Sequence, residues 1–106
     1  MLIIIKSFPF DNEDALAALS LATATSDAGI NVSVVFVGNG LYCTQITPSL
    51  DTFHIRTYSE IVKALMGAVP FYAIGKKPKN SVKGIKNIEY IDLIVLMEQE
   101  KDIIIL

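Results

Sequence analysis

The sequence VSVVFVGNG, residues 32–40, decides the fold because it joins a β-branched apolar run to two closely spaced glycines. Such a run is typical of a strand that is buried on both faces of a parallel sheet. Residues 2–6 (LIIIK), 70–74 (PFYAI) and 102–106 (DIIIL) have the same character, and residues 88–91 (IEYI) form a weaker fifth run. The sequence therefore predicts about five short strands.

Helical patterns separate these runs. Asp11 is placed to cap a first helix that continues to about Ala28 and stops at Gly29. Thr57 and Glu60 form a T-x-x-E capping box for a second helix. Gly67 follows that helix as its stop signal.

A third helix is expected from Leu93 to about Glu100, with Asp92 as its cap. Strands and helices then alternate along the chain, and right-handed crossovers place helices on both faces of the sheet. The expected architecture is a three-layer α/β/α sandwich around a mostly parallel sheet of about five strands. With 106 residues, the chain is expected to form one domain over residues 1–106.

The composition narrows the class of protein. Hydrophobic residues make up 52% of the chain and charged residues 19%, which excludes a disordered protein. The longest apolar runs have about five residues, against the roughly 20 that a membrane-spanning helix needs. The chain opens on a strand without the pattern of an export signal, and a single cysteine cannot form an internal disulfide, so a cytoplasmic location is expected.

The first helix is unusual because residues 15–26 carry no charged side chain. A helix that faces solvent on one side normally shows a charged stripe there. One side of this helix is expected to pack on the sheet and the other on another subunit. The chain is therefore expected to form a homo-oligomer or a hetero-oligomer.

Candidate binding residues follow the second predicted strand, since open α/β sheets place their sites at the carboxyl ends of strands. Gly38, Asn39 and Gly40 resemble half of a dinucleotide-binding fingerprint. The third glycine and the strand-to-helix spacing are missing, so no Rossmann cofactor site and no other cofactor is expected. A tight turn with positive φ is the simpler interpretation.

Cys43 is the one candidate nucleophile, and two interpretations of it stay open. Near the carboxyl edge of the sheet, helix dipoles and lysines would lower its pKa and make it a sulfur carrier. Alternatively, Cys43 is a small buried apolar residue that packs beside Leu41 and Tyr42.

Lysines follow the third predicted strand. Residues 76–86 hold five of the nine cationic side chains, and Lys76, Lys77 and Lys79 come directly after the strand. They are candidates to bind phosphate, an RNA backbone or an acidic partner, or they form a solvated loop. The net charge of −2 and the lack of aromatic residues within the window argue against direct nucleic-acid binding.

The segment 41–56 is long for a connection and contains the only histidine, His54, followed by Arg56. It is either a functional loop or it contains a short helix. His54 has no second histidine or cysteine at ligand spacing, so no metal site is expected. A solvated or capping role, or binding of an anion, remains for His54 and Arg56.

Taken together, the run ALAALSLATATSDAGINVSVVFVGNGLY (residues 15–42), the segment that opens a helix at Arg56 and the final DIIIL resemble the DsrE/DsrF/DsrH sulfur-relay family. The resemblance covers nearly the whole chain and is strongest to the DsrF/TusC type. It implies a parallel α/β/α domain that assembles into trimers or hexamers. It also implies a part in passing persulfide sulfur between proteins.

The same resemblance places the carrier cysteine of DsrE/TusD-type members just after the third strand, where this chain has Gly75, Lys76, Lys77 and Pro78. The expected function is therefore that of a non-carrier, scaffolding or interaction subunit of a sulfur relay. Two alternatives remain: a sulfur carrier that uses Cys43, and a small anion- or nucleotide-binding module.

Overall fold

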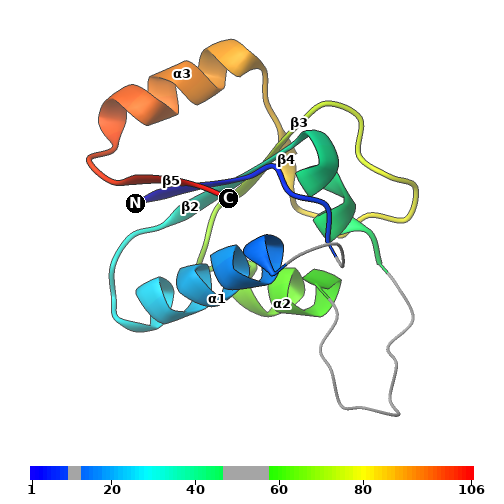
Figure 1. The fold of residues 1–106 in the computed structure, drawn as a ribbon, viewed down its shortest axis with the longest axis horizontal. Helices are drawn as coiled ribbons and strands as arrows, with labels where there is room; N and C mark the ends of the chain where they lie inside the picture. The colour runs from blue at the N-terminus through cyan, green and yellow to red at the C-terminus, as the bar shows by residue number, and fades with distance from the viewer. Residues whose placement is uncertain (10–12, 47–57) are drawn as a thin grey trace.

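A computed structural model describes residues 1–9, 13–46 and 58–106 (Figure 1). The elements follow in the order β1 (Leu2–Ile5), α1 (Asp14–Asp27), β2 (Ser33–Val37), the 3₁₀ helix η1 (Gly38–Thr44), α2 (Tyr58–Leu65), β3 (Phe71–Ile74), β4 (Lys86–Asn87), α3 (Tyr90–Gln99) and β5 (Ile103–Ile105). The strands form a five-stranded sheet in the order β4-β3-β2-β1-β5, and every pairing is parallel.

Helices cover both faces of this sheet. Figure 1 shows α1 and α2 side by side on one face and α3 alone on the other. The predicted three-layer α/β/α sandwich with a parallel sheet of five strands is thereby confirmed. The two outer layers are unequal, because one face has two helices and the other has one.

Alternation along the strands divides the core between the two faces. In β1, Ile3 and Ile5 contribute to the larger cluster beneath α1 and α2, whereas Leu2 and Ile4 contribute to a smaller cluster beneath α3. Both pairs are buried, which explains why the strand is apolar without interruption. The smaller cluster has five buried members: Leu2, Ile4, Val35, Ile74 and Leu93.

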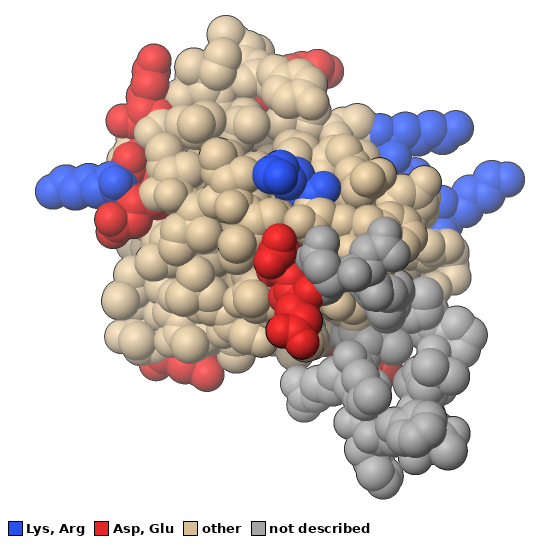
Figure 2. Space-filling model, viewed as in Figure 1, with Lys and Arg blue, Asp and Glu red and all other residues tan. Residues whose placement is uncertain are grey.

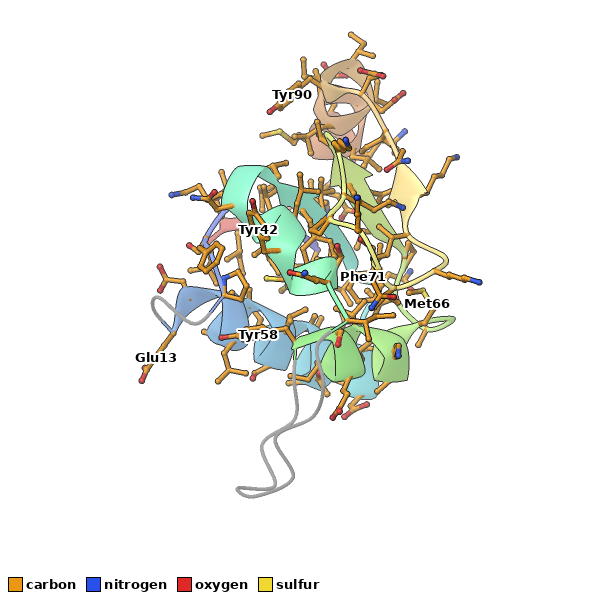
Figure 3. All side chains as sticks on the ribbon, turned by 90° about the vertical axis from the view of Figure 1, so that its right-hand side faces the viewer. Glu13, Tyr42, Tyr58, Met66, Phe71 and Tyr90 are labelled. Atoms are coloured by element: carbon orange, nitrogen blue, oxygen red, sulfur yellow. The ribbon has the colours of Figure 1, made fainter. Side chains whose placement is uncertain are left out.

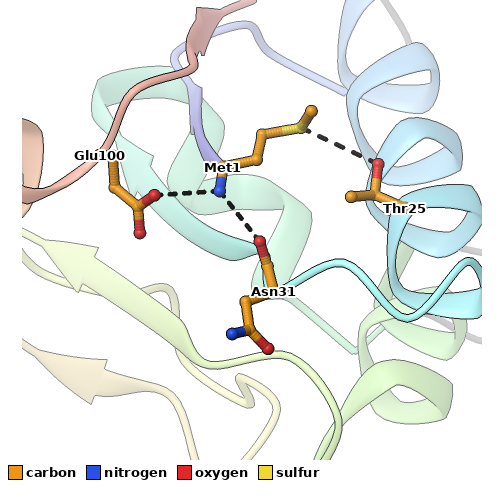
Figure 4. Close-up of polar contacts among 4 residues, drawn as sticks. All are labelled: Met1, Thr25, Asn31 and Glu100. Atoms are coloured by element: carbon orange, nitrogen blue, oxygen red, sulfur yellow. Dashed lines mark hydrogen bonds and ion pairs between the residues drawn. The ribbon is translucent and has the colours of Figure 1, made fainter.

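The start of β1 is held by contacts from three segments (Figure 4). The amino group of Met1 donates to the backbone oxygen of Asn31 at 2.9 Å and pairs with a carboxylate oxygen of Glu100 at 3.0 Å. The hydroxyl of Thr25 on α1 lies 3.9 Å from the sulfur of Met1. These contacts tie the amino edge of the sheet to both helical layers.

Helix α1 begins at Asp14, with Glu13 in the N-cap position, and ends at Asp27. Gly29 then adopts a φ of +79°, in agreement with its predicted role as a stop signal. The predicted caps Asp11 and Thr57 lie outside the described residues. Gly67, with a φ of +95°, follows α2 as expected.

The prediction of a strand at residues 88–91 is wrong. The fourth strand is Lys86–Asn87, and only the amide of Ile88 continues its pairing, by donating to the Ala73 oxygen at 2.9 Å. Helix α3 already begins at Tyr90 because Glu89 and Asp92 form a capping box, in which the Glu89 amide donates to the Asp92 carboxylate at 2.9 Å. Asp92 thus lies inside the first turn instead of capping a helix that begins at Leu93.

Candidate functional site

The carboxyl ends of β2 and β3 open into a hollow of about 360 Å³. One wall comes from η1, which follows β2, and the other from the loop after β3. The hollow is lined by Gly38, Asn39, Leu41, Tyr42, Lys76, Lys77, Pro78 and Lys79. We call it the lysine pocket. Five of the six binding residues expected from the sequence are therefore neighbours in space.

Glycines shape the wall that η1 contributes. Gly38 begins η1 with a φ of +54°, a conformation that side-chain-bearing residues rarely adopt. Gly40 does not line the pocket and instead packs against the backbone of Ile5. The expected tight turn with positive φ is thus found at Gly38, while Gly40 serves close packing.

Backbone hydrogen bonds hold the two walls together. The amide of Ile46 donates to the oxygen of Asn80 at 2.9 Å, and the amide of Val82 donates to the oxygen of Thr44 at 2.8 Å. The Thr44 hydroxyl in turn donates to the oxygen of Leu41 at 2.7 Å. The lysine segment is therefore fastened to the end of η1, and the pocket has defined walls.

The three lysines differ in their freedom to bind a ligand. The ammonium group of Lys77 donates to the backbone oxygen of Ile85 at 3.0 Å, which fixes that side chain. Lys76 and Lys79 are exposed, and within residues 1–9, 13–46 and 58–106 neither forms an ion pair. No carboxylate is among the lining residues, so the pocket carries uncompensated positive charge.

The charge distribution is visible at the molecular scale. Figure 2 shows blue lysine side chains projecting on the right, the end of the sheet where Figure 1 places η1 and the loop after β3. Red carboxylates lie elsewhere on this face, in keeping with the overall net charge of −2. A protein that is acidic as a whole thus presents a local basic surface at the carboxyl edge.

Tyr42 is a lining residue that the sequence reasoning missed as a binding group. It projects from η1 (Figure 3), is 45% exposed and packs against Phe8 with ring centroids 5.0 Å apart. The sequence window 76–86 has no aromatic residue, but folding places this one beside the lysines. The only signal in the sequence is its position two residues after Gly40, in the segment that follows the second strand.

Cys43 lies on the inner side of η1, away from the pocket. It belongs to the large core cluster, and its side chain has no solvent exposure. Burial raises the pKa of the Cys43 thiol to about 12, because the charged thiolate would lose its hydration; a backbone hydrogen bond opposes this only in part. At neutral pH Cys43 is a protonated, enclosed thiol.

The remaining candidates concern the segment 41–56 and a metal site. His54 and Arg56 lie outside the described residues, and in the parts of the chain that the structure describes no group of three metal-ligating side chains occurs. Residues 41–44 of the long segment are part of η1, which begins at Gly38, and residues 47–57 lie outside the described residues. No described helix has the length and apolar character needed to cross a membrane.

Comparison with known proteins addresses the fold. No family model and no curated protein matches the sequence. Among solved structures, the chain is similar to the ychN protein from E. coli, with a TM-score of 0.81, 12% sequence identity, and coverage of 99% of this chain and 97% of that one. This likeness supports a DsrE-like fold, while the DsrF/TusC subtype stays a prediction.

Proposed function

We propose that this chain is a non-carrier subunit of a sulfur-relay assembly. A DsrE-like fold supports a general role of this kind. In such an assembly the chain would hold and position a subunit that carries the persulfide, without accepting sulfur itself. The oligomeric state, the partner subunits and the DsrF/TusC subtype belong to this proposal.

The burial of Cys43 carries the proposal. It is the only cysteine of the chain, it has no solvent exposure, and burial raises the pKa of its thiol to about 12. Sulfur transfer requires an accessible thiolate, since the thiolate is the nucleophile. A carrier function for Cys43 would need η1 to leave the core.

The loop after β3 gives independent support. The family resemblance expects a carrier thiol there in DsrE/TusD-type members, and this chain has Lys76, Lys77 and Lys79 around Pro78. A cationic pocket is suited to receive an anionic group that a partner presents, such as a thiolate, a persulfide or a carboxylate. We therefore assign the pocket a docking role in the relay instead of a carrying role.

Persulfide loading tests the proposal. The protein is incubated with a cysteine desulfurase and cysteine, and its intact mass is measured; the native chain should gain no adduct of about 32 Da, the mass of one added sulfur atom. A matched control places a thiol in the pocket by Lys76→Cys in a Cys43→Ala background. This variant should gain the adduct, which shows that the donor reaches the pocket.

Two results would contradict the non-carrier assignment. One is a sulfur adduct on Cys43 of the folded wild-type chain, mapped by peptide fragmentation. The other is loss of sulfur transfer through a reconstituted relay on Cys43→Ala substitution, with the melting temperature unchanged. Either result would establish the alternative in which Cys43 is the carrier.

A second candidate function is a small anion- or nucleotide-binding module. The combination of Tyr42 with Lys76 and Lys79 favours it, because an aromatic ring beside cations can hold a base and its phosphates. Thermal-shift titrations with pyrophosphate, adenosine and adenosine diphosphate would distinguish the ligands. Stabilisation by the nucleotide well beyond that by pyrophosphate would favour this second function.

A further inference from the structure

A second hollow, of about 470 Å³, lies between the end of α2 and the loop that joins β3 to β4. Its volume is within the range of roughly 300–1,000 Å³ that is typical of sites for small molecules. Among the described residues, it shares no lining residue with the lysine pocket. We define this α2 pocket by six of its lining residues: Ile46, Lys63, Met66, Asn80, Val82 and Lys83.

Three apolar side chains connect the α2 pocket to the core. Val82 is 3% exposed and belongs to the larger cluster, and Ile46 and Met66 are partly buried against that cluster. The sulfur of Met66 (Figure 3) packs against Gly84 of the same loop, where a Cβ atom would lie 3.3 Å from it. The base of the pocket is therefore apolar surface, which favours a ligand with an apolar part.

Backbone hydrogen bonds fix the walls of the α2 pocket. The bond from the Ile46 amide to the Asn80 oxygen, which fastens the loop after β3, also joins two walls of this pocket. At the end of α2, the amide of Met66 donates to the oxygen of Lys63 at 3.2 Å. Asn80 has a φ of +61°, the only positive φ outside glycine among the described residues, and asparagine adopts this conformation more readily than most residues. The pocket therefore has its shape before a ligand binds.

Two ammonium groups belong to the α2 pocket. Lys63 comes from the last turn of α2 and Lys83 from the loop, and both are exposed. Within the described ranges neither lysine forms an ion pair, and the described lining includes no carboxylate. Asn80 is exposed as well, and its side-chain amide is a neutral hydrogen-bond donor. An anionic group therefore meets two unpaired cations and one further donor in this pocket.

The apolar base and the two cations together select a ligand that is both anionic and apolar. Inorganic phosphate offers charge but has no apolar part to cover Ile46, Met66 and Val82. A neutral hydrocarbon covers the base but leaves both ammonium groups without a partner. A carboxylate on a short alkyl or aromatic body matches both features, and its single charge costs less to remove from water than the several charges of pyrophosphate.

We propose that the α2 pocket binds a small organic carboxylate with an apolar body. The body lies on the apolar base of the pocket. The carboxylate accepts hydrogen bonds from the ammonium groups of Lys63 and Lys83 and from the side-chain amide of Asn80. The inference uses no residue of the lysine pocket and is independent of the sulfur-relay proposal.

Titration of the isotope-labelled protein with hexanoate, followed by the chemical shifts of the backbone amides, tests the proposal. Hexanoate should bind with a dissociation constant on the order of 1 mM, as expected for a ligand of this size, and should shift the amides of Ile46, Val82 and Lys83. Acetate lacks the apolar body and hexanol lacks the charge, so each should bind at least about 10-fold more weakly. Hexanoate shifts that avoid these three amides, or equally tight binding of acetate or hexanol, would overturn the proposal.

Lys63→Gln combined with Lys83→Gln should weaken hexanoate binding about 10-fold, because both charges beside the carboxylate are lost. The matched control, Lys76→Gln with Lys79→Gln, removes the same charge from the lysine pocket. At ~150 mM salt, which screens charges outside the α2 pocket, it should change the hexanoate affinity by less than about 2-fold. Both variants should keep the wild-type melting temperature, since these lysines are exposed. Equal weakening by the two pairs, or displacement of hexanoate by an equal concentration of pyrophosphate, would show a response to positive charge in general and would overturn the proposal.

Discussion

Gly40 packs directly on the backbone carbonyl of Ile5. A Cβ atom at Gly40 would lie 2.0 Å from the Ile5 oxygen and 2.7 Å from the Ile5 carbonyl carbon. This contact lets η1 lie across the end of β1 and bury Cys43 in the core beneath it. The position of the pocket wall therefore depends on the absence of a side chain at one residue.

Gly40→Ala should destabilise the protein by at least about 2 kcal/mol, because rigid backbone must move to admit the methyl group. Gly38→Ala is the matched control. Its Cβ would meet nothing within 4 Å, so only the φ of +54° opposes it, at a cost of about 1 kcal/mol. Urea unfolding measures the free energy of unfolding of both variants. An equal loss of stability in the two would show that the contact with Ile5 adds nothing to the cost of a side chain at Gly40.

Ala22→Glu should destabilise the protein by more than about 3 kcal/mol, because an unpaired carboxylate would enter the core. Ala18 and Ala22 have no exposure and face the sheet, so such a charge meets sheet packing and not a subunit contact. The control Ala24→Glu lies on the exposed side of α1 and should change the stability by less than about 0.5 kcal/mol. Thermal unfolding measures the stability of both variants. An Ala22→Glu variant as stable as wild type would contradict the burial of Ala22 between α1 and the sheet.

Stability should fall with rising pH through the titration of Cys43. Its thiol titrates near 9.0 when unperturbed and at about 12 in the fold, so between these values the unfolded chain loses a proton that the native chain keeps. From pH 8 to pH 10, wild type should lose about 1 kcal/mol more than Cys43→Val, which has no thiol. Equal losses in the two proteins would mean that the native thiol ionises as readily as the unfolded one.

Lys76→Glu combined with Lys79→Glu should weaken the binding of pyrophosphate about 10-fold at low salt, because both charges face the lysine pocket. The fold should stay intact, since exposed loop charges contribute little to stability. The control exchanges Lys63 and Lys83 for glutamate, which alters the net charge equally outside the pocket. Calorimetric titration at two salt concentrations measures both variants, and equal weakening would leave the pocket with no specific role.

Part of the candidate site could be predicted from the sequence. The carboxyl ends of parallel strands meet at one edge, so Gly38, Asn39 and the lysines after β3 were expected to be neighbours, and they line one pocket. The contribution of Tyr42 could not be predicted, because packing and not the sequence decides which side of η1 faces the pocket. The direction of Cys43 was equally open, since either side of a short helix is compatible with its position in the sequence.

The sequence alone determined the layers. Uninterrupted apolar runs such as residues 2–5 must pair their backbone hydrogen-bonding groups and bury side chains on both faces. A parallel sheet covered by helices on both sides meets these two requirements, so the runs themselves predict the layers. The sequence also predicted a strand at residues 88–91, which is wrong, because so short an apolar run does not distinguish a strand from the first turn of a helix. There the capping box of Glu89 and Asp92 prevailed.

Only the tertiary structure decided what each buried or exposed position does. Gly40 packs against Ile5, Cys43 lies buried on the inner side of the same 3₁₀ helix, and desolvation keeps its thiol protonated. The register of β5 on β1 leaves Ile103 and Ile105 open beside α3. The burial of a side chain depends on atoms that are far apart in the sequence. The reactivity of the Cys43 thiol and the position of the exposed apolar side chains therefore follow from tertiary packing.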